Sequence, residues 1–222
     1  MNAANSLGAT LTEPEHEIAV GGLALQLAPG VFPPDRFPST GILLEWAQEH
    51  IPIGARILEL GTGCGAIAVA LALRRGVTGL ACDISSRAVD NARANARRHG
   101  VDERIAVLLS DVFAGLPRDS SPFEVIIWNS PFMRGEPDAP ADEFQDPGYA
   151  AFGRFFGGLA AQLTPGGRAY LGFGSIGDFG LLSAKAATHG WSLHERHSVA
   201  IHEPAGSFDY AVIEVVANDA DS

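Results

Sequence analysis

Polar residues and glycines follow four successive apolar runs of the sequence, and their types suit the binding of a nucleotide. They are Gly61, Gly63 and Gly65 after the first run, then Asp83, Asp111 and Asn129 after the next three. Alternate glycines let the backbone turn sharply and approach a ligand closely. The N–H groups at the start of a following helix can then bind that ligand. One acid after a strand is common as a helix cap, but this succession is not, so we expect a nucleotide-type cofactor site.

The two acids have different roles open to them. Asp83 lies 18 residues beyond Gly65, where a carboxylate can accept hydrogen bonds from both hydroxyls of a ribose. Asp111 can accept from an exocyclic amine such as that of adenine. The residues that follow these acids, Ile84 and Val112, are expected to line the same cofactor site.

The fourth run ends in Asn129-Ser130-Pro131-Phe132, which suits a planar nitrogen nucleophile. Such an N–H₂ group has two hydrogens to be held. The side-chain carbonyl of Asn129 can accept one and the backbone carbonyl of Ser130 the other. Pro131 would stiffen the turn, and Phe132 offers a ring face to a planar substrate or to developing charge. We expect Asn129, Pro131 and Phe132 to be catalytic and Ser130 to contact substrate; the alternatives are a plain turn and core packing.

The elements that must position these residues alternate between strand and helix. Strands are predicted at 56–60, 77–82, 105–109, 123–128 and 168–173, with helices at 65–74, 86–99, 149–163 and 177–188. The last two strands, 191–200 and 208–216, are joined by a short loop and should be antiparallel. This order predicts a seven-stranded α/β sheet, Rossmann-like and mostly parallel with the last strand reversed, with helices on both faces. Ligands bind such sheets outside the carboxyl ends of the strands.

The first 50 residues are interpreted as an N-terminal extension of one cofactor-binding domain, 51–222. Residues 1–15 are expected to be a flexible tail, and residues 18–27 a hairpin around Gly21-Gly22. A proline-stiffened segment follows at 30–38. Ser39 or Thr40 is expected to cap a helix that runs to about His50.

Composition narrows the class of protein. With 222 residues, 46% hydrophobic and 18% charged, the chain can form one large domain with a core. A net charge of −11, with a single lysine, argues against tight binding to a phosphate backbone, so nucleic acid is a disfavoured partner. Cys64 and Cys82 follow no disulfide or metal spacing, and we expect no metal site. The sequence shows no signal peptide and no membrane span, so we expect a cytoplasmic protein.

The glycine run is compatible with two different cofactors. The spacing Gly61-x-Gly63-x-x-Ala66 satisfies a dinucleotide fingerprint. A short-chain dehydrogenase would need a tyrosine four residues before a lysine, but Leu181 stands at that position before Lys185, the only lysine. The other cofactor is S-adenosylmethionine.

The series Glu59-x-Gly61-x-Gly63-x-Gly65 resembles the first motif of class I methyltransferases. This resemblance also accounts for the reversed last strand, for Asp111 and for the residues after the fourth strand. It implies that Glu59 holds the methionine end of S-adenosylmethionine through its ammonium. It also implies that Thr62 and Asn129 line the cofactor site.

Residues 129–132, here called the 129–132 motif, resemble the Asn-Pro-Pro-Tyr motif of N-methyltransferases that act on planar amides or amino groups. Ser130 and Phe132 replace the second and fourth residues of that motif. Upstream, residues 22–40 are similar to the hairpin and proline-rich segment of the HemK-like glutamine methyltransferases and their small-domain relatives. The resemblance implies a methyltransferase that modifies nitrogen.

The acceptor implied by the resemblance is a small amine or amide or a protein glutamine. The release-factor enzymes of that family carry an N-terminal helical domain, which we do not expect in this sequence. That feature and the acidic loop 133–148 favour a small molecule. Phe37, Thr40 and His202 are expected near the substrate. The alternatives are non-methyl chemistry such as intramolecular cyclisation, methylation of a nucleic-acid base, or cofactor binding without turnover; the sequence leaves the oligomeric state open.

Overall fold

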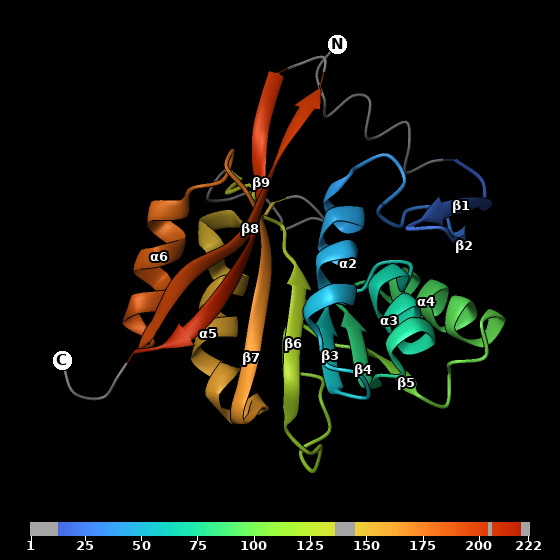
Figure 1. Ribbon diagram of the computed structural model, residues 1–222, viewed down its shortest axis with the longest axis horizontal. Helices are drawn as coiled ribbons and strands as arrows, with labels where there is room; N and C mark the ends of the chain where they lie inside the picture. Colours follow the sequence, from blue (N-terminus) through green and yellow to red (C-terminus); the bar gives the residue numbers. More distant parts are fainter. Residues whose placement is uncertain (1–12, 136–144, 204–205, 219–222) are drawn as a thin grey trace.

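The computed structural model describes residues 13–135, 145–203 and 206–218. Its strands form a seven-stranded sheet in the order β5-β4-β3-β6-β7-β9-β8 and a separate hairpin, β1-β2 (Figure 1). They are β1 His16–Val20, β2 Leu23–Leu27, β3 Arg56–Leu60, β4 Thr78–Asp83, β5 Ile105–Leu109, β6 Phe123–Asn129, β7 Leu163–Gly174, β8 Trp191–Glu203 and β9 Gly206–Ala217. Only β9 pairs antiparallel within the large sheet, with β7 on one side and β8 on the other. The predicted mostly parallel sheet with its last strand reversed is confirmed.

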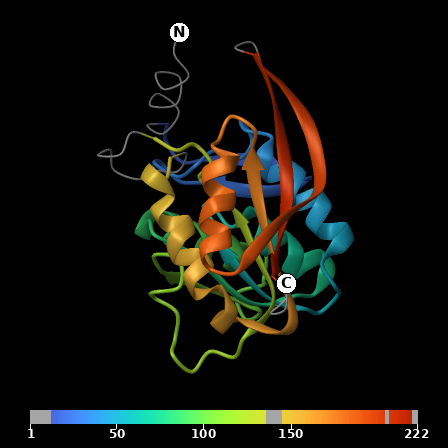
Figure 2. The ribbon, with the colours of Figure 1, turned by 90° about the vertical axis from the view of Figure 1, so that its left-hand side faces the viewer.

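Helices cover both faces of this sheet (Figure 2). They are α2 Ser39–His50, α3 Ala66–Arg75, α4 Ser86–Arg98, the 3₁₀ turn η1 Pro147–Tyr149, α5 Ala150–Gln162 and α6 Phe179–Thr188. Side chains alternate between two cores because a strand presents successive residues to opposite faces. In β3, Ile57 packs in the core shared with α2, α3, α4 and the hairpin, whereas Leu58 packs in the core shared with α5 and α6.

The hairpin packs on the outside of α4 through two asparagine side chains. Nδ2 of Asn91 donates to the carbonyl of Gln26 at 2.8 Å, and its Oδ1 accepts from the N–H of Ala28 at 3.0 Å. Nδ2 of Asn95 also donates to the carbonyl of Gln26, and Oδ1 of Asn95 accepts from the N–H of Gln26. The hairpin and α2 therefore share a core with residues beyond 51, and the division of the chain at residue 50 stays a prediction, as does the flexible tail, whose residues 1–12 lie outside the described part.

The C-terminal strands differ most from the prediction. The predicted turn at 164–167 lies within β7, where the pairing with β6 shifts register between Phe123 and Val125. The predicted loop at 202–206 is largely strand, because the pairing of β8 with β9 continues to Glu203 and Gly206. The pairing of β7 with β9 ends at Gly174 and Tyr210. The outer parts of β8 and β9 therefore form a two-stranded arm that projects beyond the carboxyl edge of the sheet (Figures 1 and 2).

Candidate active site

The glycine loop, residues 61–65, joins β3 to α3 and is held in place by hydrogen bonds to Glu59. The φ angles of Gly61, Gly63 and Gly65 are +61°, +57° and +87°, a left-handed region that favours glycine. One carboxylate oxygen of Glu59 accepts from the hydroxyl of Thr62 at 2.7 Å and from the N–H of Ala68 at 3.0 Å. Glu59 is only 2% exposed, and burial raises its pKa to about 8. Within this structure Glu59 ties the loop to the first turn of α3, and its contact with a cofactor ammonium stays a prediction.

Asp83, at the end of β4, holds the other side of the same loop. Its Oδ2 accepts from the N–H of Gly63 and its Oδ1 from the N–H of Ser85, each at 2.9 Å. Burial raises the pKa of this carboxyl group, although the two N–H groups favour its ionised form. Ile84 follows with 68% of its surface exposed. A carboxylate and an exposed apolar side chain therefore lie together beside the loop, as a ribose and an attached base require.

The next strand end is less open than predicted. Oδ1 of Asp111 forms an ion pair with Nη2 of Arg154 in α5 at 3.0 Å, so this carboxylate already has a partner. Val112 is buried in the core on the side of α5, with a φ of +50°. The hydroxyl of Ser110 donates to the carbonyl of Val112 at 2.8 Å and accepts from the N–H of Gly115 at 2.9 Å, which holds this bend. The proposed contacts of Asp111 and Val112 with adenine stay predictions.

Asn129 ends β6 beside the glycine loop, because Leu60 pairs with Trp128 in the parallel ladder of β3 and β6. Its Nδ2 donates to the hydroxyl oxygen of Thr40 at 3.0 Å and to that of Ser39 at 3.5 Å. The prediction that Ser39 or Thr40 caps α2 is wrong: Pro38 is the N-cap residue and no side chain caps the helix. Both hydroxyl-bearing residues lie in the first turn, buried, and bind the amide of Asn129 instead.

The carbonyl oxygen of Asn129 accepts a hydrogen bond from the hydroxyl of Tyr210 at 2.7 Å. Tyr210 lies in β9 and is not among the residues predicted for the site. A glycine within a strand marks a place where another group approaches closely, and Gly172 in β7 stands between Asn129 and Tyr210. That glycine was the available signal, but it does not identify the group that approaches it.

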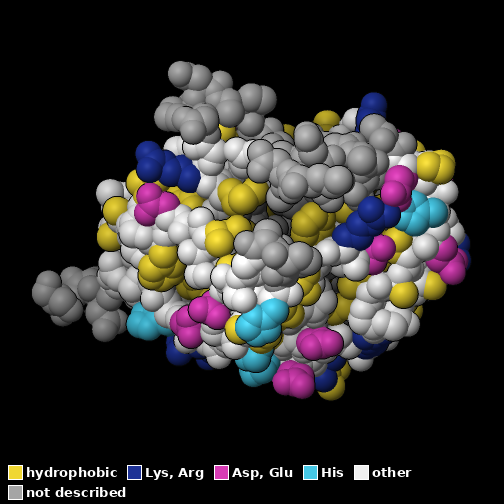
Figure 3. All heavy atoms as spheres, turned by 90° about the horizontal axis from the view of Figure 1, so that it is seen from above, with side chains coloured by type: hydrophobic (Ala, Val, Ile, Leu, Met, Phe, Trp, Pro, Cys, Tyr) yellow, Lys and Arg dark blue, Asp and Glu magenta, His cyan; other side chains and the backbone are white. Residues whose placement is uncertain are grey.

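The remaining residues of the 129–132 motif are held by the neighbouring strands and by η1. The hydroxyl of Ser130 donates to the carbonyl of Gly172 at 2.7 Å, and the hydroxyl of Tyr149 donates to the carbonyl of Phe132 at 2.6 Å. The ring of Phe132 is half-buried among those of Phe173, Phe208 and Tyr210, at centroid distances of 6.1 to 6.4 Å. Phe132 therefore packs in an aromatic cluster without being fully buried, and Pro131 beside it is also half-buried. Seen from above, hydrophobic side chains gather near the centre of this face and most charges lie toward its rim (Figure 3).

Two residues expected near the substrate make contacts with other parts of the chain. Phe37 stacks on Phe32 with a centroid distance of 5.2 Å, just before α2. His202 lies on the exposed arm, where its Nδ1 is 2.8 Å from the hydroxyl of Ser207. Within the described residues, no hydrogen bond joins either of them to Asn129, and their roles stay predictions.

The acidic loop is described only at its ends, since residues 136–144 lie outside the described part. Asp146 belongs to the acidic loop in sequence, but its side chain is buried and does not contribute to an acidic surface. It is 1% exposed, and its carboxylate accepts from the N–H groups of Ala151 and Phe152 at 3.0 and 3.1 Å. Asp146 therefore holds the first turn of α5, where a negative charge is favourable.

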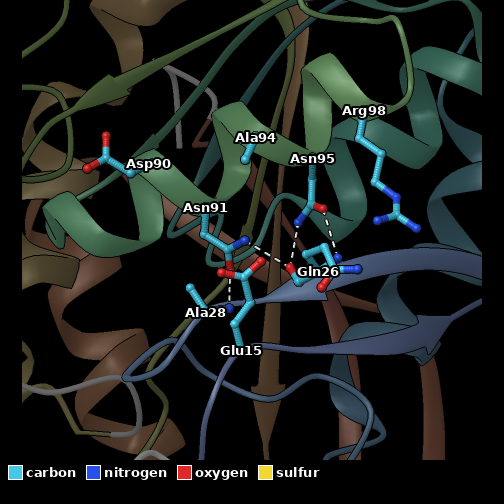
Figure 4. Close-up of a pocket in the computed structure, with 8 residues that line it drawn as sticks. All are labelled: Glu15, Gln26, Ala28, Asp90, Asn91, Ala94, Asn95 and Arg98. Atoms are coloured by element: carbon cyan, nitrogen blue, oxygen red, sulfur yellow. Dashed lines mark hydrogen bonds between the residues drawn. The ribbon is translucent and has the colours of Figure 1, made fainter.

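A separate hollow of about 240 Å³ lies between the hairpin and α4 (Figure 4). Figure 4 shows the amides of Asn91 and Asn95 pointing from α4 to the hairpin backbone, which uses their donors and acceptors. Its lining includes none of the predicted site residues. In the part of the chain that the structure describes, no group of three or more His, Cys, Asp or Glu residues could hold a metal ion, and no helix is long and apolar enough to cross a membrane.

The sheet order and the placement of the polar strand ends define a Rossmann-like methyltransferase fold. The solved 16S rRNA N2 G1207 methyltransferase of T. thermophilus, in complex with AdoMet and guanosine, matches with a TM-score of 0.65 at 23% identity, over 92% of this chain and 50% of that chain. The ribosomal protein L11 methylase of Lactobacillus delbrueckii subsp. bulgaricus matches with a TM-score of 0.61 at 16% identity, over 86% and 84% of the two chains. At such identities the likeness concerns the fold alone.

The family model described as "methyltransferase small domain" matches residues 22–171, and the chain belongs to that family. The release factor glutamine methyltransferase of Mycolicibacterium smegmatis is 38% identical over 140 residues, which cover 61% of this chain and 48% of that protein. The enzyme of the same name from Bordetella pertussis is 34% identical over 154 residues, 62% of this chain and 55% of that protein. The chain thus spans about half the length of these relatives. The resemblance to class I methyltransferases of the HemK-like branch is confirmed.

Proposed function

We propose that this chain is an S-adenosylmethionine-dependent methyltransferase that transfers a methyl group to the nitrogen of a planar amide, with a protein glutamine as the first acceptor to test. The observation that carries the proposal is the position of Asn129 beside the glycine loop at adjacent strand ends. The sheet order β4-β3-β6 changes direction there, and ligands bind open α/β sheets at such a point.

The residues around the glycine loop fit the cofactor. A Cβ added at Gly63 would meet no atom within 4 Å, so this side of the loop is open to a ligand. The oxygens of Asp83 accept from backbone N–H groups and keep lone-pair capacity for a ribose hydroxyl. Ile84 offers apolar surface to the base. When bound, S-adenosylmethionine supplies an activated methyl group on a sulfonium sulfur.

The residues around Asn129 would hold and orient the acceptor nitrogen. The carbonyl oxygen of Asn129 has two lone pairs, of which the hydroxyl of Tyr210 uses one. The second can accept an N–H of the acceptor, and the backbone carbonyl of Ser130 can accept its other N–H. Such positioning is the main contribution a protein makes to a displacement reaction. Phe132 is only half-buried, and its ring is the apolar surface that would lie against a planar acceptor.

Two observations favour a glutamine amide among the possible acceptors. The relatives that match over about half their length are named for the methylation of a glutamine. A primary amide also presents two N–H groups in one plane, which matches the two carbonyl acceptors at the 129–132 motif. The net charge of −11 does not favour a nucleic-acid acceptor.

The test is product analysis with the purified chain. The protein is incubated with S-adenosylmethionine and either a glutamine-containing peptide, the matching peptide with glutamate in place of glutamine, or a small primary amide. We expect S-adenosylhomocysteine and N-methylglutamine with the first peptide, and neither above background with the second. Turnover of the small amide alone would show that the acceptor is a small primary amide and not a protein glutamine. Methylthioadenosine, or tight cofactor binding without any product, would overturn methyl transfer itself.

A further inference from the structure

We propose that Tyr210 is a positioning residue of this site: its hydroxyl reaches across β7 to fix the carboxamide of Asn129 with the carbonyl oxygen turned to the acceptor. The inference rests on the proposed function. The hydroxyl is 2.7 Å from Oδ1 of Asn129, and the two residues are 81 positions apart in the sequence.

The path of the tyrosine side chain depends on the strand between the two residues. Asn129 of β6 pairs with Gly172 of β7, and Gly172 pairs with Val212 of β9. A Cβ added at Gly172 would lie 1.8 Å from the hydroxyl oxygen of Tyr210 and 3.0 Å from Oδ1 of Asn129. The side chain of Tyr210 therefore crosses β7 at Gly172, where the absence of a side chain leaves room for it.

Only one orientation of the Asn129 amide satisfies this hydroxyl. Tyr210 is fully buried, and within the described part of the chain its hydroxyl has a hydrogen bond to Asn129 alone. If the amide turned over, its NH₂ group would face the hydroxyl, whose proton would then be buried without an acceptor. That is an unfavourable state for a polar group away from water. On the opposite side, the hydroxyl oxygens of Thr40 and Ser39 accept from Nδ2.

The hydroxyl of Tyr210 also keeps its proton under all working conditions. Burial alone raises the pKa of this phenol far above its ordinary value. It therefore remains a donor, and the Asn129 group opposite it remains an acceptor. The consequence for the reaction is that the free lone pair of Asn129 keeps one direction before the acceptor arrives.

The first experiment is Tyr210→Phe, which removes only the hydroxyl. We expect kcat to fall about 10- to 100-fold, the order of loss that misplacement of a reacting group produces. The Kd of S-adenosylmethionine should stay within two-fold, because the glycine loop and Asp83 are unchanged. The matched control is Tyr170→Phe, since Tyr170 of β7 is another buried tyrosine in the same core, packed against Trp46. Its kcat should stay near that of the wild type.

The second experiment separates positioning from a structural role. Tyr210→Phe is introduced into Asn129→Ala, where no amide is left to orient, and we expect less than a two-fold further loss of kcat. An equal loss in both backgrounds, or a weakened cofactor Kd, would show a structural role and overturn the inference. If the wild type is active and Tyr210→Phe is equally active, the inference is also overturned, while the proposed function stands. If the wild type itself shows no methyl transfer, the proposed function fails and the inference falls with it.

Discussion

The glycine loop after β3 and Asn129 after β6 lie at neighbouring strand ends, yet they are held by different kinds of contact. The side-chain hydrogen bonds that fix the loop join residues 3, 9, 20 and 31 positions apart. Those that fix the amide of Asn129 join residues 81, 89 and 90 positions apart. The first end of the site is built within residues 59–95, by β3, α3 and the adjoining β4 and α4, whereas the second joins α2, β6 and β9 from distant parts of the chain.

This difference predicts which property each substitution changes. Changes near the loop should weaken cofactor binding and leave the chemical step largely intact. Changes around Asn129 should reduce turnover and leave cofactor binding intact, since their partners lie on α2, β7 and β9. Substitutions at either end can therefore show whether the two are energetically separate.

The largest effect is expected from Asn129→Ala. It removes the acceptor for one N–H of the substrate, and the loss of one such group from a preorganised site typically lowers kcat about 10²- to 10³-fold. Binding of S-adenosylmethionine, measured by calorimetry, should be nearly unchanged. Asn218→Ala is the control, because Asn218 is exposed at the end of the described chain. Activity of Asn129→Ala within a few-fold of the wild type would remove the assigned role.

Gly172→Ala should come next, with about a 10- to 100-fold lower kcat. The new methyl group would occupy the position of the Tyr210 hydroxyl, so the tyrosine or β7 must move. Overpacking of this kind also costs about 1 to 3 kcal/mol of unfolding free energy, which urea denaturation would measure. Gly180→Ala in α6 is the control, since its Cβ would meet only Asp178 Oδ1, at an ordinary 3.5 Å. Wild-type turnover in Gly172→Ala would contradict the path drawn for Tyr210.

Asp83→Asn is expected to have a smaller effect, and on cofactor binding instead of turnover. The amide loses one acceptor oxygen for a ribose hydroxyl and for the N–H of Gly63, and we expect the Kd of S-adenosylmethionine to rise about tenfold, or about 1.4 kcal/mol. At saturating cofactor, kcat should stay within a few-fold. Asp90→Asn serves for comparison, because the Asp90 side chain is 80% exposed on α4. An unchanged Kd for Asp83→Asn would exclude the ribose role.

The smallest effect is a change in the pH dependence of stability. Because burial raises the pKa of Glu59 from 4.5 to about 8, the folded state holds a proton that the unfolded state releases between these values. This contribution to stability is complete below pH 4.5 and is lost as the pH rises through 8. Thermal melts between about pH 5 and pH 8.5 should show a flatter profile for Glu59→Gln than for the wild type. Glu45→Gln, at an exposed position of α2, should keep the wild-type slope; the same slope in Glu59→Gln would mean that its carboxyl is ionised in the fold.

The local parts of the molecule were predictable from sequence. The strands Arg56–Leu60 and Ile105–Leu109 were predicted at the bounds observed, because short apolar runs bounded by turn residues specify buried strands. The positive φ angles of the glycine loop and the place of Asp83 at the end of β4 follow from the same local pattern. The reversed last strand followed from the short loop before it.

Residues whose partners lie far along the chain were not predictable in this way. Ser39 and Thr40 have the composition of helix caps, and only the packing of α2 on the sheet turns them to Asn129. Asp146 lies in an acidic sequence, yet it is buried against α5. Tyr210 is a buried position of β9 between two residues that are not buried, and nothing near it in sequence distinguishes a core tyrosine from one that binds the site.

The insertion of β9 between β7 and β8 has a consequence for how the site matures. During synthesis from the N-terminus, the glycine loop and Asp83 can reach their final contacts while the last strands have still to be made. Tyr210 joins Asn129 only when the C-terminal hairpin docks along β7, which until then is an open edge of the sheet. On the proposed function, a nascent chain would gain its affinity for the cofactor before its competence for transfer, and the docking of the last hairpin would complete the transfer site.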